Sequence, residues 1–224
     1  MIDSMDRPLW MRRQSIANWQ IFAALLGINI LLIWLVRAQV LRSEFIYQLF
    51  QEQIEMTRLD DQLELWRGWF NLNFILVPLA LFLKLCFVTF VLQFPLLFLL
   101  EDVAYRDIFR VAMIAQLAML AAAIIQVVIL YLKPPLAPDM ENLGRMPLSL
   151  AGLTGQYSSL SIPARTIINR FNLFELIWCL IVYYKLKSLI TMKSVDLVIL
   201  VSAVWIFLLI LQWLSTEVLM LLSS

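Results

Sequence analysis

VAMIAQLAMLAAAIIQVVILYL, residues 111–132, contains 22 residues and no charged side chain. The hydrocarbon core of a bilayer is about 30 Å thick, so roughly 20 apolar residues in helical form cross it. Four other stretches reach or approach this length, namely 19–36, 70–100, 171–192 and 195–222. The stretch 70–100 holds one crossing rather than two, because each crossing needs about 20 residues. The pattern predicts an all-α, polytopic transmembrane bundle with five spans.

The composition agrees with this fold class and argues against catalysis. Of the 224 residues, 62% are hydrophobic and 15% are charged, and the mean hydropathy is +0.86. The chain has no histidine, so a typical zinc site, haem ligation by histidine and Ser-His or Cys-His catalysis are excluded. It also lacks a phosphate-binding P-loop and a G-x-S-x-G motif. We therefore expect no enzymatic activity, no catalytic residues and no cofactor.

The sequence also argues against a nucleic-acid partner and a metal site. A net charge of +1 gives no reason to expect a nucleic-acid partner. Glu101, Asp102 and Asp107 are the best carboxylates for a metal ion. Without histidine, however, a charged helix face at the membrane interface is the better interpretation, and we expect no metal site.

The domain organisation follows from the apolar stretches and the segments between them. Residues 1–18 form a basic segment before the first span. Residues 19–69 hold the first span, interpreted as retained rather than cleaved, and an acidic helix. Residues 70–224 form a four-helix transmembrane region. It is interrupted at 133–169 by a loop that contains five of the eight prolines and three of the five glycines. The apolar part of that loop, 146–155, is expected at the interface or folded back over the bundle.

Lysine and arginine give the orientation. Five spans place the two ends on opposite sides, and the counts of basic residues on the two sides are equal. The N-terminal side carries its basic residues in shorter segments, where the positive-inside rule applies best. We therefore expect a cytoplasmic N-terminus and an outer C-terminus. The absence of an N-x-[ST] glycosylation acceptor favours the bacterial inner membrane.

Residues 42–66 are predicted to form an amphipathic helix outside the membrane. Apolar residues recur there at helical spacings, and the segment contains neither glycine nor proline. Its acidity disfavours binding to anionic lipid. We expect it to pack against the bundle or, alternatively, to dock onto a partner. The candidate partner-binding surface consists of Glu52, Glu55, Asp60, Asp61, Glu64 and Trp66.

Lys84 and Glu175 are the notable pair of charged residues within the predicted spans. A charge at mid-membrane costs about 2.5–3.5 kcal/mol on insertion scales, so each residue needs a partner or must reach an interface. One interpretation is an intramembrane ion pair, or a proton-linked element, between the second and fourth spans. The other is that Glu175 lies near the headgroups while Lys84 extends to an interface or pairs structurally.

Four single amides also fall within apolar helices, and a substrate pathway usually gathers several polar groups on one face. Interhelical hydrogen bonds are the ordinary use of such amides. We therefore interpret all four as structural. They are Asn29, Gln93, Gln116 and Gln126.

Two segments resemble the Yip family of five-span integral membrane proteins. The first is YRDIFRVAMIAQLAML, residues 105–120, in which a charged link leads into the third span. The second is IPARTIINRFNLFELIWCLIVYYKLKSL, residues 162–189, which is similar to the Asn-Pro-Phe-x-x-Trp segment of the family. Asn169 and Phe171 fit that pattern, whereas Arg170 stands where the family has proline.

The resemblance covers roughly residues 70–220 and implies no catalytic residues. Eukaryotic relatives contact prenylated small GTPases through a long cytosolic N-terminal region, whereas here only about 18 residues precede the first span. Some bacterial relatives are accessories of ABC-type exporters.

Two hypotheses of function follow. The first is a non-catalytic subunit that binds and organises or stabilises a larger inner-membrane complex, a transporter or a secretion machine. Its partners would be membrane lipids and other integral membrane subunits, with an ABC-type exporter among the candidates. The alternative is a small transporter or channel that uses Lys84 and Glu175 within the membrane.

Overall fold

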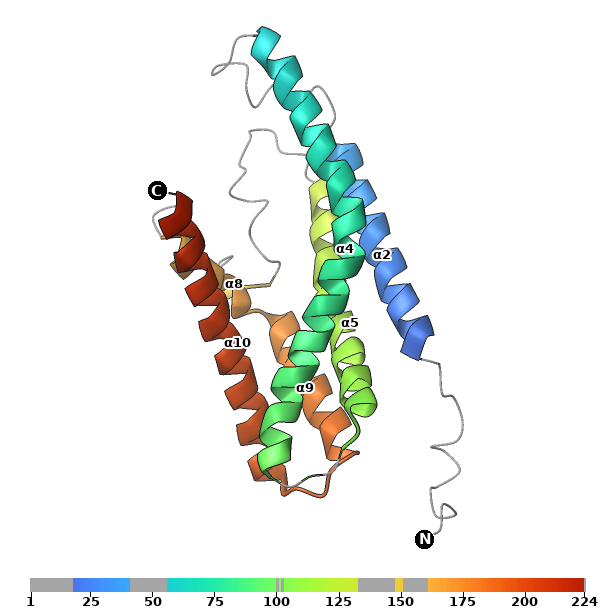
Figure 1. Ribbon diagram of the computed structural model, residues 1–224, viewed down its shortest axis with the longest axis vertical. Coiled ribbons are helices and arrows are strands. Elements are labelled where there is room, and N and C mark those ends of the chain that lie inside the picture. Colours follow the sequence, from blue (N-terminus) through green and yellow to red (C-terminus); the bar gives the residue numbers. More distant parts are fainter. Residues whose placement is uncertain are drawn as a thin grey trace.

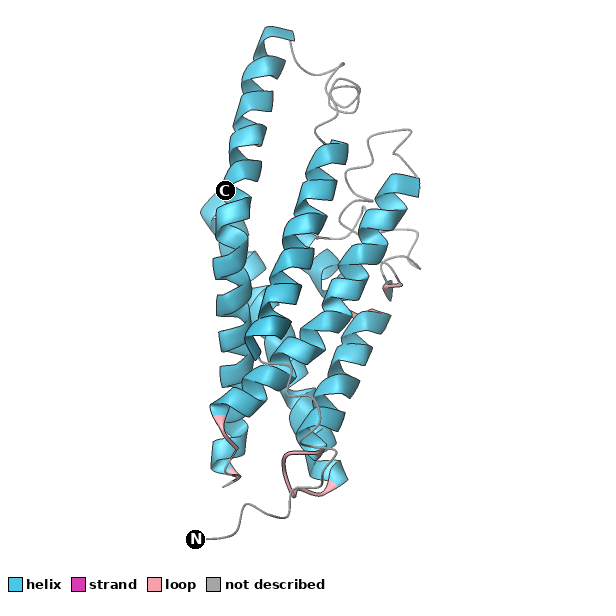
Figure 2. Ribbon diagram, turned by 90° about the vertical axis from the view of Figure 1, so that its right-hand side faces the viewer, coloured by secondary structure: helices cyan, strands magenta, loops and turns pink. Residues whose placement is uncertain are grey.

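The computed structural model describes residues 18–40, 56–99, 101, 103–132, 148–150 and 161–223. In this part of the chain the regular structure is helical, as the sequence predicts (Figures 1 and 2). The helices, in chain order, are α2 (Asn18–Val40), α4 (Met56–Phe98), α5 (Tyr105–Leu132), α8 (Ile162–Arg170), α9 (Leu173–Lys187) and α10 (Ser194–Ser223).

Four of these helices are long and apolar enough to cross a membrane. The qualifying segments are Asn18–Ala38, Leu76–Phe98, Tyr105–Ile129 and Ser194–Val218. The multi-pass membrane class expected from the sequence is therefore supported by four helices. The predicted fourth span, 171–192, corresponds to α9, which has 15 residues and is shorter than the roughly 20 that cross a bilayer.

Helix α4 extends well beyond the second predicted span. Its 43 residues run without interruption from Met56 and include Pro78 and Pro95. The part of the predicted acidic helix from 56 to 66 therefore forms the first turns of α4, and 42–55 lies outside the described residues. The chain leaves the helix after Phe98, where the Leu99 N–H donates to the Pro95 carbonyl at 3.2 Å.

Buried alanines recur along α5. Ala112, Ala115, Ala118 and Ala122 follow one another at spacings of three or four and are nearly fully buried. Small side chains at such spacing let two helix backbones approach each other closely. The most extensive helix–helix contact is that of α5 with α9, and Trp178 of α9 lies in the same core cluster as Ala115 and Ala118.

The two ends of the bundle differ. At one end, which we call the closed end, Thr191 of the turn 188–193 donates to Glu101 and α4 meets α10 (Figure 1). Toward the other end, the open end, α4 and α10 diverge (Figure 1). Helix α2 packs on the far side of α4 and α5 through a second cluster that includes Leu25, Leu81 and Met113.

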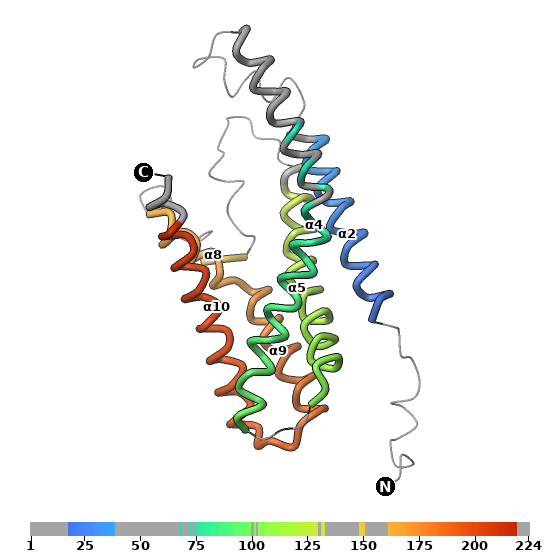
Figure 3. The backbone as a smooth tube through the Cα atoms, in the orientation of Figure 1, coloured from blue at the N-terminus to red at the C-terminus, as the bar shows by residue number. Residues whose placement is uncertain are grey.

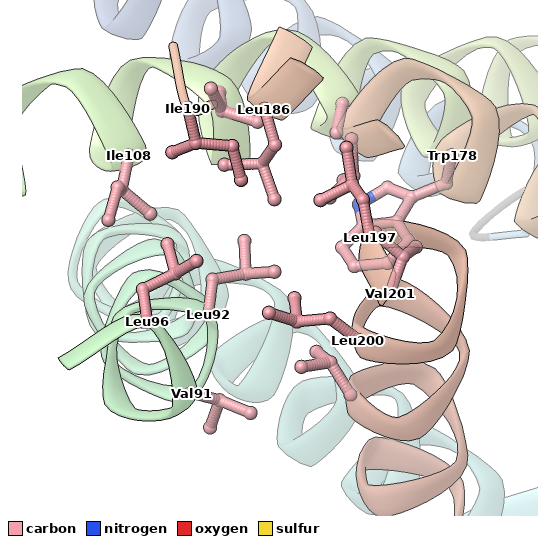
Figure 4. Packing of buried hydrophobic residues seen from close by; sticks show 14 of the residues in the cluster. Val91, Leu92, Leu96, Ile108, Trp178, Leu186, Ile190, Leu197, Leu200 and Val201 are labelled. Atoms are coloured by element: carbon pink, nitrogen blue, oxygen red, sulfur yellow. The ribbon is translucent and has the colours of Figure 1, made fainter. Parts of the chain in front are cut away.

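The closed end is held by an apolar cluster from α4, α5, α9 and α10 (Figure 4). Because these residues fill the space between α4 and α10 at that end, we call them the apolar seal. Its central members are Leu92, Leu96, Ile108, Leu186, Leu197, Leu200 and Val201.

Helix α8 differs from the sequence expectation, which placed a loop over 133–169. Pro163 occupies the first turn of α8, where a missing backbone donor costs nothing because the first N–H groups have no partner within the helix. The proline that indicated a loop is therefore compatible with the start of a helix.

Candidate functional site

The site begins at a break between two helices. Helix α8 ends at Arg170, and α9 starts at Leu173 after a direction change at Phe171 and Asn172 (Figure 3). Asn172 caps α9, since its Oδ1 accepts the Glu175 N–H at 2.8 Å. Its Nδ2 donates to the Asn169 carbonyl at 2.7 Å. A side chain that bonds to the backbone on both sides fixes the break.

A short strand-like segment supports this break from the other side. The Leu150 N–H donates to the Phe171 carbonyl at 2.9 Å, and the Leu173 N–H donates to the Leu148 carbonyl at 3.3 Å. Leu148 has φ 55°, a left-handed conformation that is uncommon for leucine. Residues 148–150 thus fold back onto the α8–α9 junction. The rest of the loop, 133–147 and 151–160, lies outside the described residues.

Arg170 connects the break to two other positions. Its guanidinium forms a salt bridge with the Glu175 carboxylate, of which only 7% is exposed. Its Nε donates to Oε1 of Gln212 on α10 at 2.6 Å. Arg170 is the residue that stands where the resembling family has proline, and a proline here could make neither contact.

Lys84 lies in the same region as this pair. It is close enough to Arg170 and Glu175 to interact electrostatically with both charges. Among the described residues, however, the salt bridge of Glu175 is formed by Arg170. Lys84 is exposed toward the space between α4 and α10 and has no salt-bridge partner among the described carboxylates. The structure therefore brings the two sequence-predicted residues into one site and adds Arg170.

These residues line a crevice of about 320 Å³ between α4 and α10. Its walls include Phe87, Trp178, Trp205 and Leu208. Its polar residues come from all of α4, α5, α8, α9 and α10. They are Lys84, Gln116, Arg170, Glu175, Gln212 and Ser215.

Lys84 of the crevice lies within Leu76–Phe98, a segment long and apolar enough to cross a membrane, whereas Glu175 lies on the shorter α9. Lys84 is 14 residues from the end of α4 at Phe98, about 21 Å at the helical rise of about 1.5 Å per residue. Glu175 is 12 residues from the end of α9 at Lys187, about 18 Å by the same measure. Both distances fall within a hydrocarbon core of about 30 Å. The apolar seal lies nearer the closed end, since Leu92 and Leu96 follow Lys84 along α4.

A second cavity, of about 680 Å³, adjoins the α8–α9 junction. It is lined by Leu148 and Ser149 of the folded-back segment and by Phe171. Arg170, Glu175 and Trp205 line both cavities, so the salt bridge borders each of them.

The amides interpreted as structural behave differently from one another. Asn29 donates to the Leu25 carbonyl of its own helix at 2.7 Å. Gln93 donates weakly to the Val103 carbonyl at 3.4 Å, and its buried Oε1 has no partner among the described residues. Gln116, in contrast, lines the crevice.

The acidic surface predicted on 42–66 lies largely outside the described residues. Glu52 and Glu55 lie outside the described residues, and for Asp60, Asp61, Glu64 and Trp66 only the helical backbone of α4 is described.

Of the three carboxylates considered for a metal ion, two are described. Glu101 accepts a hydrogen bond from Thr191 at 3.3 Å, and Asp107 lies in the first turn of α5. Asp102 lies outside the described residues. The described part of the chain contains no group of three candidate metal ligands.

Sequence reasoning missed Arg170 and Gln212 as site residues. One signal for the break was present, because Asn172 and Glu175 have the spacing of a capping box, which marks a helix start. That signal places the N-terminus of α9, and therefore Glu175, next to Arg170.

Comparison with known proteins identifies no relative from which a role for the site could be transferred. The resemblance to the Yip family accordingly stays a prediction. No protein-family model, curated protein or solved structure matches the chain.

Proposed function

We propose that the protein is a small, non-catalytic membrane transporter that binds an anionic solute in the crevice between α4 and α10. The observation that carries this proposal is the convergence of six polar side chains from five helices on one crevice. Single polar residues in spans are ordinarily structural, whereas a group of them facing one cavity is typical of a substrate pathway.

The charge of the crevice supports an anion rather than a cation. Arg170 and Glu175 compensate each other in their salt bridge, which leaves the charge of Lys84 in excess. The N-terminus of α9, the positive end of its helix dipole, lies at the same place. Interrupted helices whose N-termini face an anionic substrate are a recurring arrangement in transporters.

The bundle is asymmetric in a way that suits transport. The crevice lies where α4 and α10 diverge, and the apolar seal closes the space between them toward the other end. Transport requires the seal to open while the crevice closes. A rocking movement of α10 against α4 about the α8–α9 junction accomplishes this.

The proposal includes a membrane topology. We propose that the chain crosses five times, with α8 and α9 together forming an interrupted fourth crossing. The N-terminus is then cytoplasmic, the C-terminus is outside, and the membrane is the bacterial inner membrane. The apolar length of α2, α4, α5 and α10 supports four of these crossings.

A second candidate is a subunit that organises or stabilises a larger membrane complex, with an ABC-type exporter among the possible partners. The divergence of α4 and α10 favours it, because the gap leaves a lateral face that a helix of another subunit could cover. In that case the polar residues of the crevice would bond to a partner instead of a solute.

Transport is tested with purified protein in liposomes. Two probes are followed, uptake of labelled inorganic phosphate and transbilayer movement of fluorescent phosphatidylglycerol. We expect movement of at least one probe, slowed by Lys84→Gln and by Glu175→Gln. The matched control Lys193→Gln removes an exposed charge at the closed end and should retain the wild-type rate. Movement of neither probe above that in protein-free liposomes contradicts the transporter proposal.

The two candidates are separated by purifying the tagged protein from native membranes in mild detergent. Mass spectrometry then identifies what accompanies it. A stoichiometric membrane partner supports the subunit candidate, and a solitary protein supports the transporter.

A further inference from the structure

We infer that the anion bound in the crevice is the phosphate head group of an anionic membrane lipid, held by Lys84. This inference rests on the proposed function, because it names the substrate class of the same site. Three observations carry it, namely the unbalanced charge of Lys84, the direction in which the crevice opens, and the nature of its walls.

Lys84 needs a counter-charge that the described protein does not provide. It lies on α4 at membrane depth and is exposed in the crevice. A lysine exposed to hydrocarbon is unfavourable, and pairing or hydrogen bonding removes much of the cost. The carboxylate in the same crevice, Glu175, is already in a salt bridge with Arg170, which also donates to Gln212. A phosphate group beside Lys84 would supply the missing negative charge.

The crevice opens between two helices that are long and apolar enough to span a membrane. Phe87 of α4 and Leu211 of α10 line it and are 41% and 40% exposed, respectively. Leu208 lines the same space. Acyl chains would lie against these side chains while the head group reached Lys84. A fully hydrated inorganic anion would instead face apolar walls on most sides, so the walls favour a lipid.

The size of the crevice is sufficient for a head group. A volume of about 320 Å³ corresponds to about ten water molecules at roughly 30 Å³ each. A glycerophosphate head group has a comparable number of non-hydrogen atoms. The side-chain amides of Gln116 and Gln212, which also line the crevice, offer N–H donors to its hydroxyl and phosphate oxygens.

The test is native mass spectrometry of the full-length protein in detergent, after incubation with equal amounts of phosphatidylglycerol and phosphatidylcholine. We expect selective retention of phosphatidylglycerol. Lys84→Gln should lower that retention about tenfold, because a hydrogen bond to a charged group is lost. Lys84→Arg should keep most of it. Lys193→Gln, an equal change of charge at an exposed position, should leave it unchanged.

The source of the phosphate is distinguished by a second arm. Inorganic phosphate and phosphatidylglycerol are each added to the protein, and the shift in the thermal unfolding midpoint is recorded. A shift with phosphatidylglycerol alone supports the lipid. A shift with inorganic phosphate that phosphatidylglycerol does not match overturns it.

Failure of this inference differs visibly from failure of the proposed function. Equal retention of both lipids by the wild-type protein overturns the lipid site, and this outcome needs no variant to fold. Selective retention of phosphatidylglycerol without movement of either probe in liposomes overturns transport and leaves the lipid site standing.

Discussion

Arg170 and Gln212, 42 positions apart in the chain, are joined by a hydrogen bond of 2.6 Å from Nε to Oε1. This bond connects the end of α8 to the part of α10 that has diverged from α4. Because Arg170 also holds Glu175 at the start of α9, the α8–α9 break and α10 are coupled through one guanidinium. Any movement of α10 that alters the crevice must therefore break or carry this contact.

The salt bridge itself gives the first prediction. Arg170→Met and Glu175→Met should each lower the free energy of unfolding by about 1–3 kcal/mol, because each leaves a poorly solvated charge behind. The double variant should lose less unfolding free energy than the sum of the losses in the two single variants. Unfolding in mixed micelles, followed by circular dichroism, measures the coupling. Additive effects would show that the two charges do not interact.

Two glutamine-to-leucine substitutions should have opposite effects. Gln212→Leu removes the acceptor of Arg170 Nε and should cost about 1–2 kcal/mol. Gln93→Leu removes a weak bond together with a buried, unpartnered Oε1, so it should be neutral or stabilising by up to about 1 kcal/mol. Thermal unfolding of the two proteins side by side tests the difference. A larger loss of stability for Gln93→Leu than for Gln212→Leu would contradict this prediction.

The cap of α9 is tested at Asn172. Asn172→Ala should destabilise the protein by about 0.5–2 kcal/mol, because the Glu175 N–H loses its acceptor. Asn172→Ser keeps an acceptor at the same place and should lose less. Chemical unfolding in detergent measures both variants. Equal losses would mean that the cap contributes little and that the amide acts through Asn169.

A larger side chain in the alanine row of α5 should overpack the contact between α5 and α9. Ala115 is fully buried against α9, so Ala115→Leu should cost about 1–3 kcal/mol by forcing the helices apart. Leu117 on the same helix is 43% exposed. Leu117→Ala should therefore stay within about 0.5 kcal/mol of the wild type. The unfolding midpoints of the two variants decide whether close helix contact matters here.

The proposed crossing by α8 and α9 is tested by cysteine labelling in a background where both native cysteines are alanine. New cysteines are placed at the ends of α5, at Ala104 and Leu132, and at the ends of α10, at Val195 and Val218. We expect a membrane-impermeant maleimide to label Leu132→Cys and Val218→Cys in intact cells. Ala104→Cys and Val195→Cys should react only after permeabilisation. Labelling of Val195→Cys from outside would mean that α8 and α9 do not cross.

Much of the fold could be predicted because membrane spans depend on local apolar length. The predicted spans 19–36, 111–132 and 195–222 each lie within a long helix of the structure, with α5 and α2 extending several residues further. Helix α9 is shorter than predicted. Its N-terminus is set by the cap at Asn172 rather than by the beginning of the apolar run at Phe171. Lys185 and Lys187 in its last turn favour an end there.

The site was less predictable because its residues meet only through tertiary packing. Lys84 and Glu175 attract notice in the sequence because a charge within an apolar run is costly. Arg170 gave no such signal, since it followed a segment expected to be a loop. Gln212 is one amide in a long apolar helix. Nothing in the local pattern indicates that these two side chains bond to each other.

The shortness of α9 has a consequence for how the chain enters the membrane. Its 15 residues span about 22 Å, so a helix of this length inserted alone would leave the Glu175 carboxylate and the polar backbone at Asn172 in contact with lipid. Those groups are satisfied by Arg170, by residues 148–150 and, through Arg170, by α10. Burial of α9 thus needs α10, which is synthesised after it, and a chain truncated before α10 would expose a site for quality-control proteases.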